Sequence, residues 1–184
     1  MEISPSGAKA PLDSPAQSAG LKPGASTQPC ATPVSDREVF RRFVEAGKRL
    51  AELHVHYEQQ PEYKLEKIWK EGSKLDYRVT KMRLSKDKSI LTYNDALTLK
   101  GIPKETYDYR LGNRSALEWV IDQYQVSTDK RSGITNDPNR PDDPQYILRL
   151  IGQVITVSLA TVKIVQSLPE FVIDEKAQAA DPRG

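Results

Sequence analysis

The feature that most constrains the fold is a helical repeat of apolar residues late in the chain, over residues 146–165. Its members recur every three or four positions and so share one side of an α-helix. They are Tyr146, Ile147, Leu150, Ile151, Val154, Ile155, Ser158, Thr161, Val162 and Val165. Several are β-branched and form helices poorly, but the period outweighs that preference. In a chain of 184 residues, such a helix is expected to lie in one domain with a substantial core.

A second amphipathic helix is predicted before Pro61. Ser35 and Glu38 have the spacing of a capping box, in which each side chain accepts a hydrogen bond from the backbone N–H of the other residue. Apolar or small residues then follow at spacings of three and four, with His54 on the same face, which predicts that His54 packs in the core. The repeat consists of Phe40, Phe43, Gly47, Leu50, His54 and Tyr57.

The middle of the chain changes to β-prone runs at 77–84, 88–93 and 96–99, separated by turn residues. These runs predict an antiparallel hairpin or small meander, followed by a short helix or turn over 103–109. Ser115 and Glu118 form another capping box and start a helix that reaches Tyr124 and buries Leu117 and Ile121. The expected fold class is α+β: long amphipathic helices packed with a small antiparallel sheet, and a long polar loop.

Residues 1–34 are rich in Pro, Ser, Ala and Gly and offer little apolar surface to offset chain entropy. We therefore expect a disordered head at 1–34, a folded domain at 35–170 and a flexible tail at 171–184. The one cysteine, Cys30, cannot form an internal disulfide, which fits a reducing cytoplasm. No window is judged long and apolar enough to span a membrane, so no membrane partner is expected.

The predicted hairpin carries five cations against one carboxylate, Asp87, a local charge of +4. These cations are Arg78, Lys81, Arg83, Lys86 and Lys88. Cations on a protruding hairpin suit a phosphate backbone, and a two-stranded ribbon fits the major groove of DNA. The alternative is a solvated, charged sheet edge that prevents aggregation, which composition alone favours.

A second polar cluster occupies the loop that follows residue 126, within a stretch that holds Gly133 and three prolines. Long loops in compact domains are usually functional or disordered. The candidate DNA contacts here are Lys130, Arg131, Ser132, Asn136, Asn139 and Arg140. Arg can pair with guanine and Asn with adenine, whereas Ser and Lys more often contact phosphates. The alternative is a loop held by its own turns, a role for which residues 136–139 are well suited.

No catalytic or metal-binding pattern is present in the sequence. His54 and His56 are two apart on a predicted helix, do not share a face, and lack further ligands for zinc. The sequence also lacks a phosphate-binding Gly-rich loop and the Gly-x-Ser-x-Gly motif of hydrolases. We therefore expect no catalytic, cofactor-binding or metal-binding residue in this chain.

Several segments, in order, resemble the C-terminal specificity region of type ISP restriction-modification enzymes. They are FVEAGKRLAELHVHYE (43–58), YRVTKMRL (77–84) with ILTYN and LKGIP, YRLGNRSALEWVIDQYQVSTDKRSGITNDPN (109–139), and QYILRLIGQVITVSLATVKIVQSLP (145–169). No one of these motifs is a catalytic signature, but the ordered set is specific. The resemblance covers about residues 37–170.

In that family one polypeptide joins a nuclease, a helicase-like translocase, a coupler and an adenine methyltransferase to this target recognition domain. The resemblance implies a DNA-binding specificity domain of a bacterial defence system, acting in the cytoplasm on double-stranded DNA beside a methyltransferase that flips its target adenine. S-adenosylmethionine and ATP with Mg²⁺ are the cofactors of the implied full-length enzyme. The chain lacks the Asn-Pro-Pro-Tyr, Walker and nuclease motifs, so we expect a fragment, split subunit or truncated frame that is not an enzyme by itself. The alternative is a protein-interaction module that docks on a methyltransferase or helicase.

Overall fold

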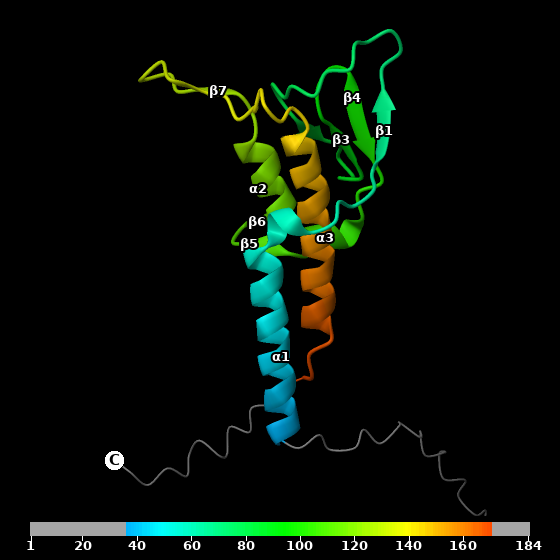
Figure 1. The fold of residues 1–184 in the computed structure, drawn as a ribbon, viewed down its shortest axis with the longest axis vertical. Helices are drawn as coiled ribbons and strands as arrows, with labels where there is room; N and C mark the ends of the chain where they lie inside the picture. The colour runs from blue at the N-terminus through cyan, green and yellow to red at the C-terminus, as the bar shows by residue number, and fades with distance from the viewer. Residues whose placement is uncertain (1–35, 171–184) are drawn as a thin grey trace, which may run out of the picture. The chain divides into compact units, whose positions relative to one another are not determined.

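The computed structural model describes residues 36–170, and three α-helices dominate this part of the chain. Helix α1 spans Asp36–Val55, α2 spans Ala116–Gln123 and α3 spans Tyr146–Gln166. Helix α3 lies beside α2 over its first half and beside α1 over its second half (Figure 1). The long apolar repeat therefore forms the central helix of the domain, as the sequence predicts.

Four short strands form an antiparallel sheet in the order β1-β4-β3-β2. Their bounds are Glu66–Trp69, Arg83–Leu84, Ile90–Thr92 and Leu97–Lys100 for β1 to β4. The hairpin predicted between 77 and 93 is present, but only its last part, β2 and β3, is paired. Strand β1 has no counterpart among the predicted runs, and residues 77–82 are not strand.

Two small hairpins and two 3-10 turns complete the described residues. One hairpin pairs β5 (Arg110–Leu111) with β6 (Arg114–Ser115), and the other pairs β7 (Ser127–Thr128) with β8 (Thr135–Asn136). The turns are η1 (Tyr57–Gln59) and η2 (Lys104–Tyr107), the second within the short helix or turn predicted at 103–109. The domain is therefore α+β, as predicted.

The main core lies where the sheet, α2 and the first half of α3 meet. Leu91, Tyr93, Leu97 and Leu99 of the sheet region are fully buried there, as is Leu117 of α2. A smaller core joins α1 to the second half of α3 and buries only Ala46 and Leu53 of α1. Because α3 offers α1 so little surface, the predicted apolar face of α1 is largely exposed, and Phe40 is 69% exposed.

Several finer predictions need correction. His54, which the sequence places in the core, is only half-buried, and Trp119 on α2 is 39% exposed. Helix α3 does pass the length and apolarity test for a membrane span, contrary to the sequence interpretation. Most of its apolar window is buried in the domain, as expected for the core helix of a globular fold. Ser35, the predicted N-cap, and the predicted head and tail lie outside the described residues.

Candidate nucleic-acid interface

The β2–β3 turn, residues 85–89, presents cations on a rigid scaffold. The Asp87 carboxylate accepts hydrogen bonds from the hydroxyls of Ser85, at 2.5 Å, and Ser89, at 2.6 Å. These bonds, the Ser85 one first, hold the pKa of Asp87 below its usual range. Lys86 at the turn and Arg83 on β2 are exposed, and neither side chain has a hydrogen bond or ion pair with a described residue. Their charges are therefore available to a ligand.

Lys88, predicted with them as a DNA contact, has a different role in the structure. Its backbone adopts φ 59°, a left-handed conformation that is uncommon outside glycine, and Tyr107 donates its hydroxyl to the Lys88 carbonyl at 2.7 Å. The Lys88 ammonium lies 2.7 Å from the Glu118 carboxylate and 5.0 Å from the centre of the Tyr107 ring. Lys88 therefore links the turn to the start of α2, and its charge is already neutralised.

Glu118 completes the capping box that the sequence predicts. Its carboxylate accepts from the Ser115 backbone N–H at 2.9 Å, while the Ser115 hydroxyl accepts from the Glu118 backbone N–H. The hydrogen bond from Lys88, followed by those from Ser115, lowers the pKa of Glu118 to about 2. The carboxylate is thus held ionised by groups that stabilise the fold.

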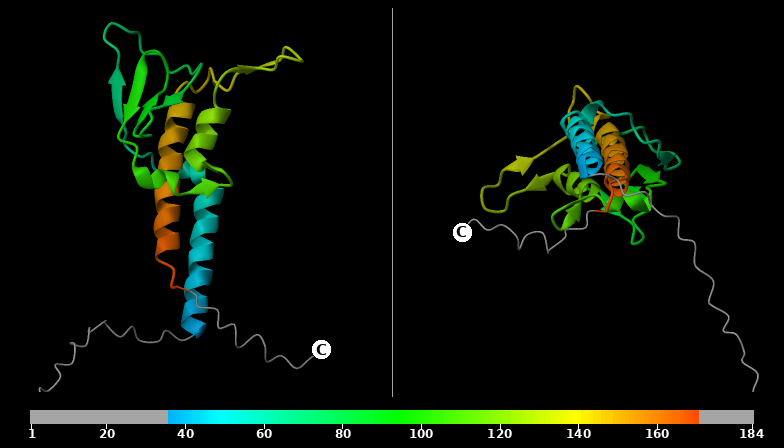
Figure 2. Two further views of the ribbon diagram at one scale, coloured as in Figure 1. Left: turned by 180° about the vertical axis from the view of Figure 1, so that it is seen from behind. Right: turned by 90° about the horizontal axis from the view of Figure 1, so that it is seen from below.

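The loop cluster contains a hairpin that projects from the domain, residues 127–136 (Figure 2). All ten of its residues are exposed, and it is held by the short β7–β8 ladder and by a 2.9 Å contact between the Thr128 and Thr135 hydroxyls. Gly133, with φ 69°, closes the tip and donates its N–H to the Asp129 carbonyl. A two-stranded hairpin is marginally stable on its own, and this one has no buried residue to stabilise it.

The tip of this hairpin carries three of the predicted contacts. Lys130 and Arg131 are exposed, and their charged groups have no partner among the described residues. Ser132 lies beside them, and its hydroxyl accepts from the Ile134 N–H at 3.3 Å. Asn136 on β8 is exposed, and its amide makes no hydrogen bond with a described residue. These side chains retain the capacity to bind DNA.

The base of the loop is structural. The Asn139 amide accepts from the Val79 N–H at 2.8 Å and donates to the Val79 carbonyl at 2.7 Å and to the Asp137 carboxylate at 2.7 Å. Asp137 also pairs with Arg78 at 2.5 Å. Bonds from Asn139, and then that from Arg78, hold the pKa of Asp137 below its usual range. The structure thus supports the alternative for Asn139, a turn residue whose amide is engaged within the fold.

Arg140 is also engaged, although it is exposed. Its guanidinium carbon lies 3.3 Å from the centre of the Tyr146 ring, at the first residue of α3. Burial raises the pKa of the Tyr146 hydroxyl well above its usual range, and that hydroxyl contacts Tyr124 at 3.3 Å and Glu58 at 3.2 Å. Stacking of this kind leaves the guanidinium edge accessible while it fixes the plane of the group.

Five predicted cations therefore keep free charges, in two groups. Lys81, Arg83 and Lys86 form the sheet group, and Lys130 and Arg131 form the hairpin group. The hairpin follows the C-terminal end of α2, whereas the β2–β3 turn is joined to the start of α2 by the Lys88–Glu118 ion pair. The sheet and the hairpin therefore lie on opposite sides of the helices, as the two side views show (Figures 1 and 2).

The described residues contain no group of three metal-ligating side chains. His54 contacts the Thr161 hydroxyl through Nε2 at 3.0 Å and stacks on Tyr109 at 5.4 Å, while His56 lies 3.5 Å from Glu52. These contacts give the two histidines separate structural surroundings.

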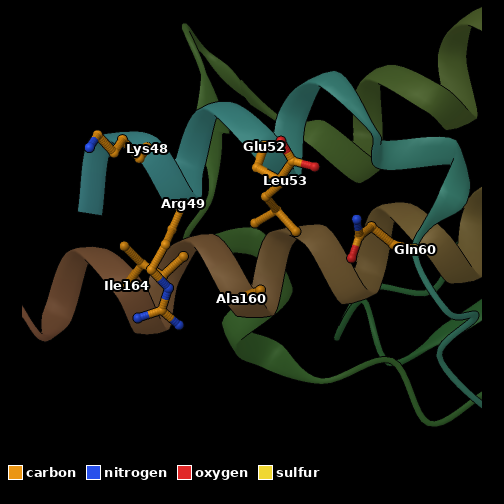
Figure 3. A pocket seen from close by; sticks show the side chains of 7 residues that line it. All are labelled: Lys48, Arg49, Glu52, Leu53, Gln60, Ala160 and Ile164. Atoms are coloured by element: carbon orange, nitrogen blue, oxygen red, sulfur yellow. The ribbon is translucent and has the colours of Figure 1, made fainter. Parts of the chain in front are cut away.

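A hollow of about 470 Å³ lies between α1 and α3 (Figure 3). Leu53, Ala160 and Ile164 form its apolar floor, and Arg49 extends across it toward Ile164. Lys48, Glu52 and Gln60 are the other polar residues of its lining.

Comparison with known proteins gives a consistent family. Residues 32–150 match the type ISP C-terminal specificity domain. No curated protein matches significantly.

Among solved structures, the ATP-dependent type ISP restriction-modification enzyme LlaBIII bound to DNA is 46% identical, with a TM-score of 0.66 over 72% of this chain and 9% of that chain. A nuclease-deletion mutant of the type ISP enzyme LlaGI, in complex with a DNA substrate mimic, is 47% identical, with a TM-score of 0.65 over 73% of this chain and 13% of that chain. A DrdV–DNA complex is 28% identical, with a TM-score of 0.59 over 73% of this chain and 15% of that chain. This chain thus spans a small fraction of the length of these proteins.

Proposed function

This chain belongs to the family of type ISP C-terminal specificity domains, and we propose that it recognises a target sequence in double-stranded DNA. The observation that carries the proposal is the pair of exposed cationic groups whose charges have no partner among the described residues, one in the sheet region and one on the hairpin. Related domains occur in enzymes that were solved in complex with DNA or a DNA mimic. The proposed setting is the cytoplasm, where such a domain would meet duplex DNA.

The two groups suit different parts of a duplex. Lys81, Arg83 and Lys86 lie on or next to the sheet, and their charged groups suit contacts to phosphates. Such contacts set the orientation of a protein on the duplex. The hairpin is a two-stranded ribbon with polar side chains on an exposed tip, a shape that enters the major groove. Of its side chains, Arg131 and Asn136 have the donor patterns that pair with guanine and adenine edges. We propose that the hairpin reads sequence and that the sheet group anchors the backbone.

Chemistry is proposed to lie outside this domain, in a methyltransferase and a helicase or nuclease of the same system. The described residues hold no group of three metal ligands, and no phosphate-binding Gly-rich loop occurs in the sequence. We propose that ATP with Mg²⁺ and S-adenosylmethionine bind to other parts of such a system. This domain would supply specificity by holding the duplex while a partner methylates the target adenine.

The test is selection of duplexes from a randomised pool with the full chain, followed by sequencing of the retained molecules. The proposal predicts enrichment of a defined asymmetric sequence. A double variant, Arg131→Ala with Asn136→Ala, should lose that enrichment while it retains weak binding to all duplexes. Binding without any sequence enrichment in the wild-type chain would refute a role in target recognition.

The alternative function is a module that docks on a methyltransferase or helicase. Helix α3 is mostly buried and offers little surface for such docking. Exposed apolar side chains lie instead on α1, with Phe40 at 69%, and on α2, with Trp119 at 39%. Substitution of Lys86 by Glu separates the two functions, because it should weaken DNA binding and leave protein docking unchanged.

A further inference from the structure

Residues 76–80, here called the bridge segment, connect the sheet to the projecting hairpin. This segment is not strand, although the sequence predicts one, and Val79 within it is fully buried. A buried backbone without a strand partner must find other hydrogen bonds, because unpaired N–H and C=O groups are costly. The partners that it finds come from both sides of the segment.

On the sheet side, the bridge segment is held by the side chains of the two residues that follow β3. The Asn94 amide donates to the carbonyls of Asp76, at 2.8 Å, and Arg78, at 3.0 Å, and the Tyr93 hydroxyl donates to the Tyr77 carbonyl at 3.0 Å. The Asn94 oxygen accepts in turn from the Ala96 and Leu97 N–H groups. Asn94 is buried and its amide is engaged through both its nitrogen and its oxygen. The sequence indicates only a turn at this position.

On the hairpin side, the same segment is held by the two ends of the hairpin. Asn139 pairs with both backbone groups of Val79, as a neighbouring strand would. The Val126 N–H, just before β7, donates to the Thr80 carbonyl at 3.1 Å. A further link is the ion pair between Asp137, which follows β8, and Arg78 of the bridge segment.

We propose that Asn139 is a positioning residue that fixes the projecting hairpin relative to the sheet, with Asn94 holding the other side of the same bridge segment. The hairpin itself touches no core and has an exposed ladder, so its direction depends on what holds its base. Both Nδ2 hydrogens of Asn139 are used within the fold, so its amide nitrogen has no donor left for a base edge. The consequence is that the two cationic groups keep one spacing and can contact one duplex together.

This inference rests on the proposed function, and its test separates the two. In a Cys30→Ser background, spin labels on Lys67→Cys of β1 and Ile134→Cys of the hairpin report the distance between the sheet and the hairpin. The parent protein is expected to give a narrow distribution. Asn139→Ala should broaden it and should reduce affinity for the selected duplex by roughly fivefold or more, the lower range for one lost specific contact. Asn113→Ala, which removes an asparagine without a side-chain bond to a described residue, serves as the control and should change neither.

A distribution that stays narrow in Asn139→Ala would overturn the positioning role, and one that broadens without loss of affinity would overturn its consequence for DNA binding. Failure of the parent to select any duplex would instead count against the proposed function. If Asn139→Ala does not fold, the positioning role is tested with Asp137→Ala instead. It removes a negative charge and frees Arg78, so electrostatics alone predicts tighter binding, whereas loss of positioning predicts weaker binding despite the gain in charge.

Discussion

The link between Lys88 and Glu118 predicts a stability that depends on pH. Substitution of Glu118 by Gln keeps the size and the hydrogen-bonding oxygen of the side chain but removes the charge. The carboxyl pKa falls from 4.5 to about 2 in the folded protein. Converted directly, this shift corresponds to roughly 3 kcal/mol, since one pKa unit is about 1.4 kcal/mol. The side chains of Lys88 and Glu118 are 47% and 27% exposed, so solvent screening reduces the expected effect to about 1–2 kcal/mol.

The pH dependence of stability follows from the lowered pKa of Glu118. A carboxyl group whose pKa is lowered by folding stabilises the native state above its unfolded pKa, and this stability is lost as pH falls from about 4.5 toward 2. Urea denaturation of the wild-type and Glu118→Gln proteins should therefore give free energies of unfolding that differ fully at pH 6, differ less at pH 3 and converge near pH 2. Glu105→Gln, on an exposed residue of η2, is the control and should change neither value. An equal difference at both pH values would refute the assignment of Lys88 to a structural ion pair.

Three core substitutions test the packing. Gly152→Ala should lower the free energy of unfolding by about 1–3 kcal/mol, because a Cβ there would lie 3.2 Å from Glu62 Cβ and from the Tyr63 carbonyl oxygen; unchanged urea stability would contradict this contact. Thr106→Val should leave stability unchanged or raise it by up to about 1 kcal/mol, because the buried Thr106 hydroxyl has no partner among the described residues; a thermal melt that shows clear destabilisation would oppose this. Leu117→Ala should cost about 2–5 kcal/mol, since Leu117 is fully buried, and a loss below about 1 kcal/mol in urea would argue against its place in the core.

The helices could be predicted from the sequence because their signals are local. The apolar period of α3 and the Ser115–Glu118 capping box depend on residues within a few positions of each other, and the structure has both elements. The exposure of α1 was not predictable in this way. A sequence period shows which residues share a face, but not whether the opposite helix has enough surface to cover that face, and here α3 buries little of α1.

The elements that were missed depend on distant partners. Strand β1 carries Glu66 and Lys67 and lacks an apolar alternation, so only its pairing with β4, some thirty residues later, defines it. Residues 77–82 have β-prone side chains but are not strand, and the side chains of Asn94 and Asn139 hydrogen-bond to the backbone of Arg78 and Val79. The β7–β8 hairpin is short and polar, and its composition is equally typical of a loop without strands.

The sequence predicts which polar and charged residues are candidates for DNA contact, but it does not predict which of them are engaged by other residues of the fold. Among the eleven predicted DNA contacts, the structure shows charge-neutralising or structural partners for Arg78, Lys88 and Asn139, and stacking for Arg140. Long-range partners such as Glu118 and Tyr107 cannot be inferred from the local sequence around a lysine. The roles of all eleven residues in DNA binding stay predictions.

The most direct test of the account is the salt dependence of binding between the full chain and a labelled duplex, measured by fluorescence anisotropy between about 50 and 200 mM salt. Five free cations predict that the logarithm of the affinity falls with the logarithm of salt concentration with a slope of up to about −4.5. The double variant Lys130→Glu with Arg131→Glu should make this slope shallower by about 2 or more, whereas Lys88→Gln should leave it unchanged. No detectable binding at the lowest salt concentration, or a slope that is the same in the wild type and the double variant, would contradict DNA recognition through this surface.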